Sequence, residues 1–177
     1  MRRYVRANLY ADIGCMAKRS AETDAVWRAF KASFGVPHDD YAVVAFDDNP
    51  ETATELADLV LAGRKRATAS LLRDYYPVGG EPLPRVGDFV VLIDGGGTPR
   101  CIWRTTEVEI KPLSAVDNSF AWDEGEGDRS RQWWLEAHRR YFTRQAGREG
   151  FAMHDGIETV FERFEVVWPV VREDKRE

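Results

Sequence analysis

The sequence predicts an α+β domain built on a curved or closed antiparallel sheet, with helices at its flanks. Two long segments, residues 100–110 and 157–168, alternate side chains with the two-residue period of a strand. Residues 20–34 carry apolar side chains at helical spacing, and residues 50–62 lie between a helix start signal and a stop signal. Strands joined by hairpins, with helices toward the ends of the chain, favour this fold class.

Composition limits the size and the class of the protein. With 177 residues, 44% of them hydrophobic, the chain can build one sizeable core and is too short for two comfortable domains. A net charge of -5 indicates that a long polyanion would be held only by a local patch. The two cysteines, Cys15 and Cys101, fit neither a disulfide framework nor a thiolate metal site. No apolar run approaches a membrane span, so we expect a soluble cytoplasmic protein that makes no membrane contact.

The first third of the chain predicts a helix, a strand and a second helix. Residues 20–34 form the first helix, and the short apolar run 41–46, bounded by aspartates, reads as a strand. Asn49 is a good N-cap and a proline follows it at the first helical position. Because Gly63 is a stop signal, the second helix is predicted over residues 50–62.

The middle of the chain predicts a β-hairpin. Residues 89–93 form its first strand, the glycines at 95–97 reverse the chain, and residues 100–110 form its second strand. Residues 111–122 are expected to be a loop.

The last third begins with an acidic, glycine-broken run at residues 123–128. Asp128 can cap a helix predicted over residues 129–145, which Gly147 would close. The strand at 157–168 then completes the sheet.

A lysine and several hydroxyls follow the second helix, at residues 63–70. Lys65 and Thr68 are three apart, which places them on one side of a helical turn but on opposite faces of a strand. If they cooperate, the backbone must bend here. The alternative is that Lys65 is a solvated charge at a helix C-terminus and that Thr68 begins a strand.

Several motifs together carry a family resemblance. They are Gly63-Arg64-Lys65-Arg66-Ala67-Thr68, Leu83-Pro84-Arg85-Val86-Gly87-Asp88, the strand Cys101 to Ile110, the run Glu124-Gly125-Glu126-Gly127-Asp128-Arg129-Ser130, and His138. The combination resembles an ASCH domain (activating signal cointegrator homology) of the longer bacterial type. The resemblance covers roughly residues 41–168, which leaves residues 1–40 as an N-terminal extension with a helix packed on the domain and residues 169–177 as a charged tail.

The resemblance implies a PUA-like β-barrel of mostly antiparallel strands, similar to domains that bind RNA. A much shorter bacterial member of the family is an amidohydrolase that acts on N4-acetylcytidine through a Lys, a Thr and a Glu. By position these match Lys65, Thr68 and Glu124, with Glu126 as a close rival. Another longer bacterial member has been described as a ribonuclease. The implied functions are therefore amidohydrolase, RNA-binding module without catalysis, or metal-dependent ribonuclease.

Chemistry leaves two roles open for the lysine. A threonine nucleophile needs a base, and Lys65 can serve only if its pKa falls from about 10.4 toward neutrality. Burial and its arginine neighbours favour that fall, whereas a nearby Glu124 opposes it. If the ion pair dominates, Lys65 is a fixed cation for an oxyanion and Glu124 carries the proton. For a catalytic lysine we expect Lys65→Ala to lower turnover on the order of 100-fold with little change in melting temperature.

The acidic run has three interpretations. It could bind a hard cation for phosphodiester cleavage, accept hydrogen bonds from a cytosine amino group, or start a helix. Its alternating glycines would let the backbone approach a ligand. His38, His138 and His154 are scattered without metal-ligand spacing, so we expect no cofactor, and a divalent metal only if the protein is a ribonuclease.

The partner is expected to be a nucleoside or single-stranded RNA; a homodimer stays open, although nothing in the sequence signals one. The candidate substrate-binding residues are Arg64, Arg66, Ser70, Tyr76, Trp122, Glu126, Asp128, Arg129 and His138. The aromatic members could stack on a base or belong to the core. His138 is interpreted as a half-buried histidine that donates one hydrogen bond, with a catalytic base as the alternative. A further set could face phosphate or form a solvated helix surface: Arg139, Arg140, Arg144 and Arg148.

Overall fold

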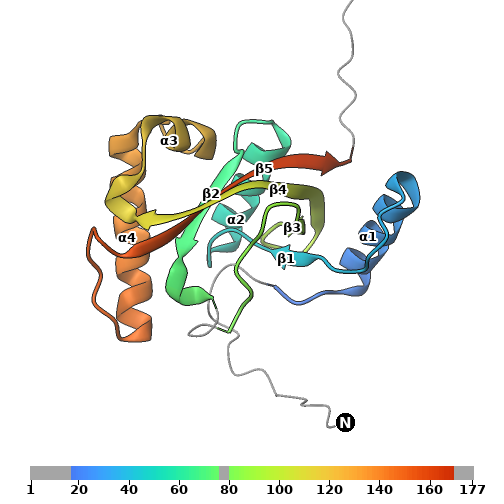
Figure 1. Ribbon diagram of the computed structural model, residues 1–177, viewed down its shortest axis with the longest axis horizontal. Helices are drawn as coiled ribbons and strands as arrows, with labels where there is room; N and C mark the ends of the chain where they lie inside the picture. Colours follow the sequence, from blue (N-terminus) through green and yellow to red (C-terminus); the bar gives the residue numbers. More distant parts are fainter. Residues whose placement is uncertain (1–16, 76–79, 170–177) are drawn as a thin grey trace, which may run out of the picture.

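A curled five-stranded sheet carries the fold, with α3 and α4 at one end, α1 at the other and α2 between them (Figure 1). The structure is a computed structural model that describes residues 17–75 and 80–169. In chain order its elements are α1 (Ala21–Phe34), β1 (Ala42–Val44), α2 (Pro50–Leu61), β2 (Ala67–Leu71), η1 (Leu72–Asp74), β3 (Phe89–Ile93), β4 (Pro99–Pro112), η2 (Leu113–Ala115), α3 (Asn118–Glu124), α4 (Arg131–Glu149) and β5 (Glu158–Trp168). No helix in these two ranges is long and apolar enough to cross a bilayer.

The strands are ordered β1-β3-β4-β5-β2. β1 runs parallel to β3, whereas the other three pairings are antiparallel. The long strands β4 and β5 pair from Ile102 opposite Trp168 to Pro112 opposite Glu158, with two register shifts along the way. Register shifts of this kind bend a sheet and increase its twist. The result is a half-barrel with β1 and β2 at its edges, which confirms the α+β class with a curved, mostly antiparallel sheet.

The two N-terminal helices begin where the sequence predicts. Ser20 caps α1 and its hydroxyl accepts a hydrogen bond from the Thr23 amide. Asn49 caps α2, and its side-chain Oδ1 accepts hydrogen bonds from two backbone amides of the first turn. Helix α1 packs against β1, β3 and β4 through Trp27 and Phe30. Helix α2 packs against the alternate residues of the same strands, so the two helices cover opposite faces of that part of the sheet.

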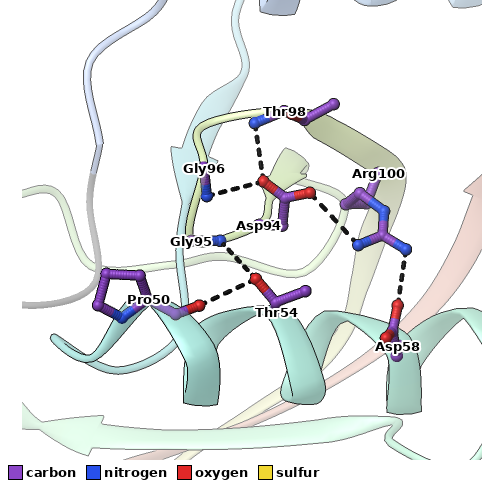
Figure 2. A network of polar contacts seen from close by, with 8 residues as sticks. All are labelled: Pro50, Thr54, Asp58, Asp94, Gly95, Gly96, Thr98 and Arg100. Carbon is purple, nitrogen blue, oxygen red and sulfur yellow. Dashed lines mark hydrogen bonds and ion pairs between the residues drawn. The ribbon is translucent and has the colours of Figure 1, made fainter.

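The turn between β3 and β4 is fastened to α2 (Figure 2). The Thr54 hydroxyl accepts from the Gly95 amide at 3.2 Å and donates to the Pro50 carbonyl oxygen at 2.9 Å. Arg100 donates to Asp58 at 2.6 Å from the start of β4. A Cβ on Gly95 would lie 1.9 Å from the Pro50 oxygen, so only glycine allows this approach. These contacts fix α2 on the sheet and thereby fix the position of the segment that follows it.

The prediction of a loop over residues 111–122 is wrong. This stretch contains η2 and most of α3, whose N-cap Asp117 accepts from the Phe120 amide at 2.7 Å. Helix α3 has only seven residues. Such a short helix depends on tertiary packing, and here Phe120 and Ala121 are buried in the same cluster as Trp134 and Phe161.

The boundaries of the last helix also differ from the prediction. Helix α4 begins after Ser130, whose hydroxyl accepts from the Trp133 amide, and ends at Gly150 in the left-handed conformation. Asp128 is not the N-cap; its carboxylate accepts from the Ser130 amide instead. The helix continues through Gly147 because Gln145 and Ala146 are buried against the core.

Candidate functional site

The chain bends sharply between α2 and β2. The amides of Arg64 and Lys65 both donate to the Leu59 carbonyl oxygen, at 2.9 and 3.0 Å, and β2 begins at Ala67. The Lys65 side chain turns inward at this bend and is only 1% exposed. The alternative in which Lys65 is a solvated charge at the helix end is therefore wrong.

The acidic run lies directly against this bend. The Arg66 amide donates to the Asp123 carbonyl oxygen at 2.6 Å, and the Arg64 guanidinium donates to the Gly127 oxygen at 2.8 Å. Gly125 ends α3 with a φ of +75°, and a Cβ at this position would lie 2.4 Å from the Arg64 oxygen. Glycine is thus required both for the turn and for the close approach. These backbone contacts bring the carboxylates of the run to Lys65.

Two carboxylates hold the Lys65 ammonium group. Its Nζ lies 2.6 Å from Glu124 Oε2 and 2.7 Å from Glu126 Oε1, and 5.0 Å from the centre of the Phe46 ring. The side chain of Glu124 is 1% exposed, whereas that of Glu126 is 19% exposed. Since an ammonium group has three donors, one N–H remains after both ion pairs form. The family resemblance left open whether Glu124 or Glu126 is the partner of Lys65. In the structure both carboxylates contact its ammonium group.

His138 approaches the other oxygen of Glu124. Its Nδ1 donates to the Trp134 carbonyl oxygen at 3.0 Å, its ring stacks on the Trp134 indole with centroids 3.7 Å apart, and its Nε2 lies 3.5 Å from Glu124 Oε1. Glu124 Oε1 is buried and, within the described part of the chain, accepts no hydrogen bond. A buried carboxylate oxygen without a donor is costly, so this atom is suited to accept an N–H or O–H from a ligand.

The charges of this cluster perturb one another. Burial by itself would lower the pKa of Lys65, but the two carboxylates outweigh it and raise the pKa above that of a free lysine. Burial would raise the pKa of Glu124, yet Lys65 and His138 outweigh it and hold that pKa well below its usual range. For Glu126, burial and the negative charge of Glu124 exceed the effect of Lys65 and raise the pKa. Lys65 is therefore a fixed cation, and Glu126 is the more basic carboxylate.

A cavity of about 310 Å³ opens beside the cluster. Its lining residues come from the segment after β1, α2, the bend, β2, η1, the acidic run and α4: Phe46, Asp47, Thr52, Leu56, Lys65, Thr68, Ala69, Ser70, Asp74, Glu124, Glu126, Trp133, Ala137, His138, Arg140, Tyr141, Phe142, Arg144 and Gln145. Thr68 and Ser70 both reach the cavity because alternate residues of β2 share a face. The Ser70 hydroxyl is hydrogen-bonded to Tyr75 at 2.6 Å, whereas that of Thr68 has no partner among the described residues. A volume of this size suits one small ligand.

Other predicted site residues lie outside the cavity lining. Arg64 and Arg66 donate to backbone carbonyl oxygens, so they fasten the bend. Trp122 is 58% exposed and carries the Arg129 guanidinium 4.7 Å from its ring centre. Asp128 is exposed at the start of α4, and Tyr76 falls outside the described residues.

Several lining residues were not predicted from the sequence. Phe46 lies beneath the Lys65 ammonium group, and Trp133 contributes an aromatic wall. Asp74 accepts from the Gln145 amide group at 2.8 Å and from the Leu71 amide at 3.1 Å. Burial raises the pKa of Asp74 to about 6. Its only sequence signal is an aspartate shortly after a strand, which is common in turns.

The carboxylates of the cluster are already engaged by the lysine. Across residues 17–75 and 80–169, no group of three or more His, Cys, Asp or Glu side chains is arranged to hold an ion. The position between Glu124 and Glu126 is occupied by the Lys65 ammonium group, which a divalent cation would have to displace.

Comparisons with known proteins agree with this architecture. The family model described as ASCH domain matches residues 42–168. The ASCH domain structure from Lactobacillus crispatus JV V101 is similar at a TM-score of 0.75 and 33% identity, covering 83% of this chain and 94% of that one. A protein structure from Enterococcus faecalis V583 is similar at a TM-score of 0.74 and 34% identity, covering 81% and 86%. No curated protein matches the chain.

Proposed function

The chain belongs to the ASCH domain family, and on that premise we propose that it hydrolyses the N4-acyl amide of an acylated cytidine or a related modified nucleoside. The observation that supports this reaction is the buried cluster of Lys65, Glu124 and Glu126, which borders a cavity also lined by Thr68. A fixed cation beside two carboxylates of different basicity provides the parts that amide hydrolysis needs.

The two carboxylates would have separate tasks. Glu124 stays ionised because its pKa is lowered, and its buried Oε1 accepts no hydrogen bond from a described residue, so it would accept the N4–H of the substrate. Glu126 has a raised pKa and greater exposure, which makes it the better general base. The remaining N–H of Lys65 would donate to the acyl oxygen and stabilise the oxyanion.

In this mechanism a water molecule attacks the acyl carbon, and its proton passes to Glu126. The C–N4 bond then breaks while Glu126 returns the proton to N4, so the products are a carboxylic acid and cytidine. We assign the attack to water rather than to Thr68 because no base among the described residues contacts the Thr68 hydroxyl. Thr68 would instead hydrogen-bond to the substrate.

The test measures the rate at which the wild-type protein converts N4-acetylcytidine to cytidine, with the two nucleosides separated and quantified by chromatography. Glu126→Gln should lower turnover on the order of 100-fold or more, and Thr68→Ala should lower it less. Glu136→Gln is the matched control, since Glu136 is exposed on α4 and its side chain accepts a hydrogen bond from Gln132 on the same helix. A chelator should have no effect.

Other results would lead to the alternative functions. If the wild type binds nucleosides or single-stranded RNA without turnover, the site is a recognition pocket. If the protein cleaves RNA and a chelator abolishes the cleavage, the metal-dependent ribonuclease replaces the amidohydrolase. A wild type that leaves N4-acetylcytidine intact while folded would overturn the hydrolytic proposal.

A further inference from the structure

Two arginines of α4 line the same cavity as the Lys65 cluster. Arg140 and Arg144 are both exposed, and they are one helical turn apart, so they project from the same side of the helix. The Lys65 cluster is buried, whereas these guanidinium groups are exposed. The cavity therefore combines a buried charged cluster with an exposed cationic rim.

Arg139 and Arg148 of α4 form ion pairs, whereas Arg140 and Arg144 form none with a described residue. Arg139 donates twice to Asp155, at 2.8 and 2.6 Å, and Arg148 pairs with Asp48 at 3.0 Å. Throughout residues 17–75 and 80–169, neither Arg140 nor Arg144 forms an ion pair. Arg144 does lie 5.5 Å from the centre of the Tyr141 ring. Among the arginines of α4, Arg140 and Arg144 are thus the two that form no hydrogen bond or ion pair with another described residue.

The remaining cavity carboxylates do not neutralise this rim by direct contact. Asp47 feels the charge of Arg144 but accepts its hydrogen bond from the Asn49 amide at 2.9 Å. Asp74 accepts from Gln145 and from the Leu71 amide. An anion at the rim would therefore meet two guanidinium groups that form no ion pair with a described residue, and such groups are the donors best suited to phosphate oxygens.

The two arginines lie further along α4 than the residue that approaches Glu124. From His138, which approaches Glu124, to Arg144 the helix rises about 9 Å. Around the helix axis Arg144 is rotated by about 120° from His138, so a ligand that reaches both residues must cross the face of α4 that lines the cavity. A cavity of about 310 Å³ has room for a single nucleotide.

We propose that the cavity takes a nucleotide rather than a free nucleoside, with Arg140 and Arg144 binding a phosphate group while the base lies against Lys65 and Glu124. The identity of the base rests on the proposed function, but the phosphate site does not. The phosphate can belong to a free 5′-monophosphate or to a phosphodiester of single-stranded RNA. Both present anionic oxygens to the same guanidinium groups.

The experiment measures affinity by calorimetry for cytidine, for the 5′-monophosphates of cytidine, uridine and adenosine, and for a short single-stranded RNA with a central cytidine. None of these ligands carries an acyl group, so binding is separated from turnover. A charge-assisted contact to phosphate should make at least one monophosphate or the RNA bind about tenfold or more tightly than cytidine. Tight binding of a monophosphate indicates a free nucleotide, and tight binding of RNA alone indicates a phosphodiester.

Four alanine variants locate the contact. Arg140→Ala and Arg144→Ala should each weaken the phosphate-bearing ligand about tenfold and change cytidine affinity less than about twofold. Arg139→Ala and Arg148→Ala remove the same charge from the same helix but from paired residues, and should change either affinity less than about twofold.

The outcomes separate this proposal from the hydrolytic one. It is overturned if no phosphate-bearing ligand binds more tightly than cytidine, or if the two control variants lose as much affinity as the two rim variants. If uridine or adenosine monophosphate binds through Arg140 and Arg144 while N4-acetylcytidine is not hydrolysed, the phosphate site stands and the proposed reaction fails. If N4-acetylcytidine and its 5′-monophosphate are hydrolysed equally well by wild type and by both rim variants, the reaction stands and the phosphate site fails.

Discussion

Replacing Lys65 by alanine should destabilise the fold as well as abolish the proposed hydrolysis. The substitution leaves Glu124, which is 1% exposed, in the core without its cation. Removing one partner of a buried ion pair costs about 3–5 kcal/mol. In a domain of this size about 1 kcal/mol shifts the melting temperature by about 2–4 °C, so we expect a drop of about 6–20 °C. The sequence alone predicts that replacing a catalytic lysine leaves the melting temperature nearly unchanged. That prediction does not apply to a lysine this deeply buried.

The stability lost in Lys65→Ala should become smaller as the pH falls. In the wild type the pKa of Glu124 is lowered, so the pair stabilises the fold above the ordinary glutamate pKa and this contribution fades as the pH falls. In Lys65→Ala, burial without a cation should raise that pKa, so the penalty is present at neutral pH and fades in acid. The difference in melting temperature between the two proteins should therefore narrow from about pH 8 to about pH 5.

Circular dichroism melts of a small set of variants test this reasoning. Adding Glu124→Gln to Lys65→Ala removes the uncompensated charge and should recover part of the loss, which a double-mutant cycle measures. Lys31→Ala is the matched control, since Lys31 pairs with Asp39, whose side chain is 88% exposed, and should cost less than about 1 kcal/mol. A Lys65→Ala protein that melts with the wild type, and no coupling to Glu124, would refute the buried ion pair.

Three further expectations concern other parts of the molecule. Burial raises the pKa of Asp74 to about 6, so its ionisation should cost up to about 3 kcal/mol as the pH rises from about 4 to about 7; Asp74→Asn should remove this dependence from the melting curve. Gly95→Ala should destabilise by about 1–3 kcal/mol, because the new Cβ would meet the Pro50 oxygen at 1.9 Å; unchanged denaturant unfolding would contradict that packing. Gly147→Ala should instead stabilise by about 0.5–1 kcal/mol, since this helical glycine has nothing within 4 Å of its Cβ position.

Local signals in the sequence predict much of the fold. The starts of α1 and α2 are set by Ser20 and Asn49, whose side chains satisfy amides of the turn that follows them. The strands β3, β4 and β5 follow from alternation and from the glycine turn at 95–97, which are also local. The short helix α3 was missed because its stability comes from burial of Phe120 against distant residues.

The site depends on contacts that no local pattern contains. Lys65 and Glu124 are 59 residues apart, and only the family resemblance placed them together. The sequence could not choose between Glu124 and Glu126, because both carboxylates reach the same ammonium group and differ in burial. The sequence also could not tell which arginines of α4 form ion pairs. The partners of Arg139 and Arg148 are Asp155 and Asp48, which lie on separate segments.

The contact between the bend after α2 and the end of α3 has a consequence for the order of folding. The Arg66 amide bonds to the Asp123 oxygen, so this contact closes a loop that contains β2, β3 and β4. Closing so long a loop is entropically expensive until the strands inside it have paired. The charges of the Lys65 cluster therefore meet late along the folding pathway. Chains that have formed only the β3–β4 hairpin would expose Lys65 without its carboxylates, so the proposed activity should recover with the last refolding phase.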